Sequence, residues 1–70
     1  MILKLNERYD VPGGYIVPRS HFERDAGANY AIFQITRFED DRFKTWHATL
    51  TKKEIKKLFP IEKGEKIEII

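Results

Sequence analysis

The segment that most constrains the fold is a pair of β-prone stretches, YAIFQITRFE and RFKTWHATL, joined by Asp40–Asp41. β-Branched and aromatic residues dominate both stretches, and a short polar link between two such runs is typical of a β-hairpin. A two-residue loop would place Phe38 opposite Phe43. The pattern therefore predicts a central antiparallel hairpin over about residues 30–50.

Alternation along the two strands gives the faces of this hairpin different characters. The face expected to join the core carries Ala31, Phe33, Ile35, Trp46, Ala48 and Leu50, with Arg37 and Lys44 at the tip. The face expected to be mostly solvated carries Ile32, Gln34, Thr36, Thr45, His47 and Thr49, with Phe38 and Phe43 near the turn. Because Asp-Asp is not a favoured turn sequence, a longer bulged loop is the alternative, and a one-residue slip would exchange the faces of one strand.

The stretch LTKKEIKKLFP has the signals of a short amphipathic helix over about residues 51–59. Thr51 is placed to cap its start, Glu54 stands three residues later as the partner in a capping box, and Pro60 is placed to end it. At helical spacing the apolar side chains of Ile55, Leu58 and Phe59 fall on one arc, and the lysines fall on the opposite arc.

The rest of the chain predicts shorter elements. Residues 1–5 and the ending IEII read as terminal strands, YIV at 15–17 as a brief strand ended by Pro18, and residues 19–29 as a loop or a single helical turn capped by Ser20. The expected fold is an α+β domain over residues 1–70, in which one helix packs on a small antiparallel sheet of the N-terminal strand, the hairpin and the C-terminal strand. A half-open β-barrel plugged by the helix is the alternative.

Composition excludes several classes of function. The chain has no cysteine, which removes disulfides and thiolate metal sites, and favours a cytoplasmic location. No apolar run is long enough for a membrane span, and no motif indicates a cofactor or a metal ion.

The sequence does not favour an enzyme. His21 and His47 are the only histidines, and the neighbours Ser20, His21 and Glu23 do not form a triad, because triads are assembled across a fold. A minimal hydrolase centred on His21, Glu23 and His47 is the least favoured of three hypotheses.

Charge distribution supports a binding module. Residues 42–57 carry six basic side chains against Glu54 alone, a net charge of +5, whereas the rest of the chain carries −3. The leading hypothesis is nucleic-acid binding, with Phe38 and Phe43 as stacking residues and Arg37, Arg42, Lys44, Lys52, Lys53, Lys56 and Lys57 as phosphate contacts. The acidic turn at residues 39–41 argues against contact at the tip itself.

The alternative is a protein-interaction module, such as a small inhibitor or regulatory subunit, that docks on an acidic partner surface. Residues 1–5 and 66–70 are the expected edge strands for pairing with a partner or with a second copy of the chain in a homodimer. Phe38 and Phe43 either pack under the N-terminal segment, against Tyr15 or Phe22, or form an exposed contact patch.

Overall fold

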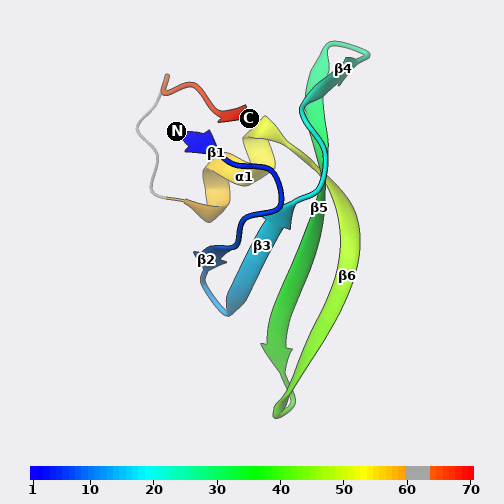
Figure 1. Cartoon of the computed structure of the whole chain (residues 1–70), viewed down its shortest axis with the longest axis vertical. Coiled ribbons are helices and arrows are strands. Elements are labelled where there is room, and N and C mark those ends of the chain that lie inside the picture. The colour runs from blue at the N-terminus through cyan, green and yellow to red at the C-terminus, as the bar shows by residue number, and fades with distance from the viewer. Residues whose placement is uncertain (60–63) are drawn as a thin grey trace.

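In a computed structural model that describes residues 1–59 and 64–70, one helix packs against a curved antiparallel sheet and a separate two-stranded ladder (Figure 1). The elements in chain order are β1 (Ile2–Leu3), β2 (Tyr9–Val11), β3 (Gly14–Pro18), β4 (Glu23–Asp25), β5 (Ala28–Glu39), β6 (Arg42–Thr51), α1 (Lys52–Leu58) and β7 (Glu68–Ile69). In the main sheet β3 and β4 pair with one side of β5, β6 pairs with its other side, and β2 lies outside β3.

The central hairpin and its register are confirmed. β5 and β6 pair without interruption from Tyr30 opposite Thr51 to Glu39 opposite Arg42, which leaves a two-residue loop. Asp40 and Asp41 both have positive φ, 52° and 62°, as a type I′ turn requires. The Asp-Asp pair thus adopts the conformation that Asn-Gly adopts more readily, and no bulge forms.

The terminal strands are the main correction to the expected sheet. β1 and β7 do not join the antiparallel sheet, because they pair with each other in parallel, Ile2 beside Glu68 and Leu3 beside Ile69. Backbone bonds from Leu5 N–H to the Ile70 carbonyl and from Ile70 N–H to the Leu3 carbonyl extend this ladder. The positions beside β5 are taken instead by β3 and β4, so the protein contains more sheet than the sequence indicated.

Residues 19–29 form no helical turn, because β4 pairs with the start of β5 there. Ser20 does not cap a helix. Its hydroxyl accepts a hydrogen bond from the Ile32 N–H and donates one to the His21 carbonyl oxygen. The strand β2 was also not predicted.

The helix is confirmed with its capping box. The Thr51 hydroxyl accepts from the Glu54 N–H at 3.3 Å, and the Glu54 carboxylate accepts from the Thr51 N–H at 3.0 Å. The chain returns to extended backbone at Phe59. The expected stop at Pro60 lies outside the described residues.

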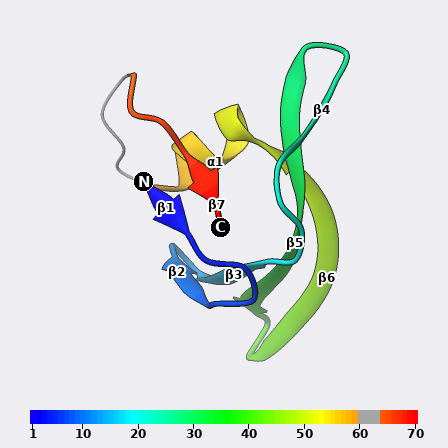
Figure 2. The ribbon, with the colours of Figure 1, turned by 45° about the horizontal axis from the view of Figure 1, so that its top comes forward.

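The sheet curves around α1 and the β1–β7 ladder, and the core fills the space between them (Figure 2). The face of the sheet turned toward α1 is called the inner face here, and it includes Ile16, Phe33, Ile35, Trp46 and Leu50. The buried core residues are Leu3, Ile16, Ala31, Phe33, Leu50, Ile55, Ile67 and Ile69. No strand pairing in the described ranges joins β2 to β6, so the sheet is open and the plugged barrel is not observed.

Two side chains depart from the predicted faces. Trp46 lies on the inner face as predicted but remains 41% exposed. Trp46 stays exposed because the helix is too short to cover the whole inner face. The seven residues of α1 span about 10 Å, whereas the ten residues of β6 span about 33 Å. Thr36, expected to be solvated, is only 2% exposed on the outer face, where its hydroxyl lies 3.0 Å from the Thr45 hydroxyl.

Within residues 1–59 and 64–70, no helix has the length and apolar character needed to cross a membrane.

Candidate functional site

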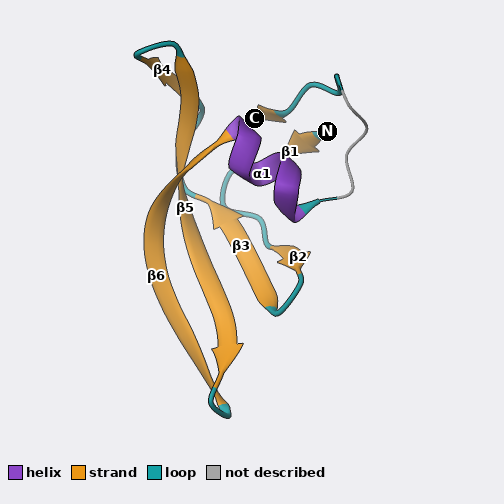
Figure 3. Cartoon of the chain, turned by 180° about the vertical axis from the view of Figure 1, so that it is seen from behind, coloured by secondary structure: helices purple, strands orange, loops and turns teal. Residues whose placement is uncertain are grey.

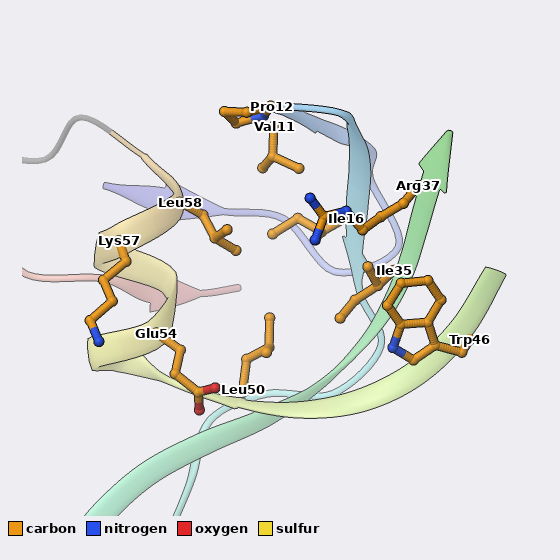
Figure 4. A pocket seen from close by; sticks show the side chains of 10 residues that line it. All are labelled: Val11, Pro12, Ile16, Ile35, Arg37, Trp46, Leu50, Glu54, Lys57 and Leu58. Carbon is orange, nitrogen blue, oxygen red and sulfur yellow. The ribbon is translucent and has the colours of Figure 1, made fainter. Parts of the chain in front are cut away.

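The uncovered part of the inner face forms the floor of an open groove beside α1, with a volume of about 520 Å³. Figure 4 shows Trp46 and Ile35 standing on the hairpin side and Leu58 pointing in from α1. The groove is lined by Val11, Pro12, Ile16, Ile35, Arg37, Trp46, Leu50, Glu54, Lys57 and Leu58. Most of these lining residues are apolar, so apolar side chains at the boundary of the core are accessible to solvent in the groove.

Three charged side chains stand at the rim of the groove. Arg37 comes from the hairpin, and Glu54 and Lys57 come from α1. One carboxylate oxygen of Glu54 is engaged by the helix cap, where it accepts from both the N–H and the hydroxyl of Thr51. These bonds lower the pKa of Glu54, the backbone bond most, so the carboxylate is ionised at neutral pH. The rim therefore carries two cations, Arg37 and Lys57, and one anion, Glu54. One carboxylate oxygen of Glu54 points toward Thr51 at the start of the helix.

The hairpin tip presents its aromatic pair on the outer face, away from the groove. The Phe38 and Phe43 rings lie 5.1 Å apart between centroids and are 54% and 65% exposed. They do not pack under the N-terminal segment. On the inner side of the tip, the Lys44 ammonium lies 3.5 Å from Glu39 and 3.9 Å from Asp40, so acidic neighbours offset its charge.

The helix lysines are divided between two surfaces. The Lys52 ammonium lies 4.9 Å from the centre of the Phe22 ring, and Lys52 and Lys53 line a second hollow beside residues 27–29. Lys57 faces the groove, and Lys56 is exposed.

The residues predicted for a nucleic-acid surface are therefore not brought together in one place. Arg37 and Lys57 share the groove, Phe38 and Phe43 occupy the outer face of the tip, and Lys52 and Lys53 lie beside the β4–β5 turn. Arg42 is exposed and pairs in register with Glu39 at the end of the hairpin.

Two of the residues considered for catalysis, Ser20 and Glu23, make ordinary structural hydrogen bonds. The Ser20 hydroxyl bonds to backbone groups, and Glu23 accepts a hydrogen bond of 3.0 Å from the Tyr30 hydroxyl, which raises the pKa of Tyr30. In the part of the chain that the structure describes, no three His, Asp or Glu side chains gather to hold a metal ion.

Sequence reasoning missed the groove because it assigned Trp46 to the core. The signal that could have revealed it was the length of the predicted helix, too short to cover the predicted hairpin. Comparisons of the chain with protein-family models, curated proteins and solved structures found no match. Neither a family nor a fold relative therefore assigns a function to this groove.

Proposed function

We propose that this chain is a small protein-binding module whose groove receives an amphipathic segment of a partner protein. The observation that carries the proposal is Trp46, a large aromatic side chain left 41% exposed on the floor of an apolar groove. Tryptophan in a concave apolar site is the residue type most enriched among binding hot spots. A bound segment with apolar side chains on one face would complete the burial that the short helix leaves unfinished.

The charges on the rim favour an acidic flank on that segment. Arg37 and Lys57 stand on opposite walls, and together with the ionised carboxylate of Glu54 these two cations leave the rim with a net charge of 2 − 1 = +1. Complementary charges at a rim raise association rates and specificity more than they raise affinity. The apolar contact with Trp46 therefore accounts for most of the binding energy, and truncation of Trp46 to Ala is expected to cost about 2 kcal/mol or more.

Photo-crosslinking tests the proposed site directly. A photoreactive side chain is placed either at Pro12, which lines the groove, or at Phe43, on the outer face, and each protein is exposed to a nuclease-treated lysate of the source cell. The proposal expects a protein adduct from position 12 that is lost when Trp46→Ala is added and weakened when Arg37→Glu and Lys57→Glu are added. An adduct from position 43 alone, or no protein adduct from position 12, would overturn it.

Nucleic-acid binding is the second candidate, favoured by the placement of exposed Trp46 in a groove between Arg37 and Lys57. An exposed indole in a groove that also carries two cations suits a single strand, because bases stack on the aromatic ring and phosphates contact the cations. The logarithm of affinity would then fall steeply with the logarithm of salt, and replacing Arg37 and Lys57 by Ala would flatten that slope. Absence of binding to single-stranded DNA and RNA at low salt would remove this candidate.

A further inference from the structure

The outer edge of β6 is open along the strand. No strand in the described ranges pairs with that side of β6, and Figures 1 and 3 show it as the outermost strand from both sides. The terminal segments expected to supply the edges are instead paired with each other, as β1 and β7. Among residues 1–59 and 64–70, the longest unpaired strand edge is therefore in the central hairpin.

The hairpin turn determines which backbone groups point outward from this edge. In a two-residue hairpin the residues that flank the loop exchange hydrogen bonds, and alternate residues along each strand then point away from the partner strand. Two hydrogen bonds on the other side of β5 show the same alternation. There the Phe38 N–H donates to the Gly13 carbonyl oxygen, and the Ile32 carbonyl oxygen accepts from the Arg19 N–H, so both residues point away from β6. On β6 the outward groups therefore belong to Phe43, Thr45, His47, Thr49 and Thr51.

This edge lacks the usual protection against strand pairing. Natural edges are interrupted by charged side chains, proline or bulges. From Thr45 to Thr51 the strand has no charged side chain and no proline, and its pairing with β5 runs without a bulge. At the opposite edge of the sheet, β2 is only three residues long and includes Asp10. The N–H of Thr51 is bonded to Glu54, so the usable edge ends there.

We propose that β6 pairs antiparallel with β6 of a second copy of this chain about a two-fold axis at His47. The sequence around that axis, Thr-Trp-His-Ala-Thr, is self-complementary in shape. Thr45 faces Thr49 of the second copy on the outer face, and Trp46 faces Ala48 of the second copy on the inner face, a large residue opposite a small one. Threonine pairs across strands are stabilising, and each hydrogen-bonded pair of outward residues exchanges two backbone bonds.

Charge favours the antiparallel direction of this pairing over the parallel one. The bases of β6, Arg42 and Lys44, lie near one end of the strand, so antiparallel pairing places the two sets at opposite ends of the dimer. Lys44 comes opposite Leu50 of the second copy, so no second basic side chain of β6 faces it. Parallel pairing would instead bring the two basic ends together. The two grooves lie on the same continuous inner face in the antiparallel dimer.

Sedimentation of the purified chain without any partner tests the dimer separately from the proposed function. The expected result is a species of twice the 8.3 kDa of one chain. His47→Pro removes an N–H that points outward and leaves the bonds to β5 intact, so it should give a monomer, whereas His47→Thr should remain a dimer. If His47→Pro does not fold, as judged by its thermal transition, His47→Lys replaces it, because two lysines facing across the axis repel.

A monomeric wild-type chain would overturn the dimer. A dimer that survives His47→Pro, or His47→Lys where the proline variant does not fold, would place the contact elsewhere and also overturn it. Neither result bears on whether a partner protein crosslinks at position 12.

Discussion

Replacing Thr51 by Ala removes the side-chain half of the capping box and tests how α1 is held at the edge of the groove. The hydroxyl accepts from the Glu54 N–H and donates to the Glu54 carboxylate at 3.1 Å. A helix of seven residues is too short to be stable alone, so its caps and its buried Ile55 must fix it. Its placement in turn positions Lys57 and Leu58 at the groove.

The expected cost follows from the cap. Loss of an N-cap threonine costs typically about 1 kcal/mol, within a range of about 0.5 to 2 kcal/mol. A chain of 70 residues has a free energy of unfolding of roughly 4 to 10 kcal/mol. The melting temperature of Thr51→Ala should therefore fall by about 4 to 8 °C for each kcal/mol, as measured by circular dichroism.

The pH dependence of the same cap provides a sharper test. Because the folded pKa of Glu54 is lowered, the charged cap stabilises the fold fully above the unfolded pKa, and this contribution is lost as the pH falls through the folded pKa. Glu54→Gln keeps an acceptor for the Thr51 N–H but does not titrate. The difference in melting temperature between wild type and Glu54→Gln should therefore shrink between pH 7 and about pH 3. A difference that stays constant over this range would refute the reasoning.

Four further substitutions separate buried from surface contributions, each measured by chemical denaturation. Gly14→Ala should destabilise the fold by several kcal/mol or prevent folding, because the new Cβ would collide with the Thr36 carbonyl oxygen. Gly27→Ala has open space around its Cβ and should cost only about 1 to 2 kcal/mol, for its positive φ. Equal costs for the two substitutions would contradict the packing around Gly14. Ile55→Ala removes a fully buried side chain and should cost about 2 to 5 kcal/mol, and a cost below 1 kcal/mol would mean that α1 does not seal the core. Lys44→Ala should change stability by less than about 0.5 kcal/mol, because its ion pairs are exposed, and a larger loss would reveal a tighter tip.

The features predictable from sequence were the local ones. Alternation and the short link defined the hairpin register, and Thr51 with Glu54 defined the start of α1, because each signal depends on residues close together in the chain. The parallel pairing of β1 with β7 has no such signal. It joins two-residue strands from opposite ends of the chain, and its ladder depends on the buried side chains of Leu3 and Ile69.

The candidate site was only partly predictable for a related reason. The predicted basic surface combined Lys57, from the +5 segment, with Arg37, from the hairpin register, and these two side chains do share the groove. It also grouped them with Phe38 and Phe43, although strand alternation places the aromatic pair on the opposite face. Net charge along a sequence does not distinguish the faces of a hairpin, and the exposure of Trp46 depends on how far the helix reaches over the sheet.

Emission from Trp46 tests the central claim most directly, because this is the only tryptophan in the chain and it stands in the groove. The protein is titrated at low salt with a synthetic amphipathic peptide flanked by glutamates, with the same peptide flanked by lysines, and with oligothymidine. A protein-binding groove predicts a blue shift that is strongest with the glutamate-flanked peptide, and a preference for the lysine-flanked peptide in the Arg37→Glu, Lys57→Glu variant. A response to oligothymidine alone, or no response to either peptide, would contradict the account.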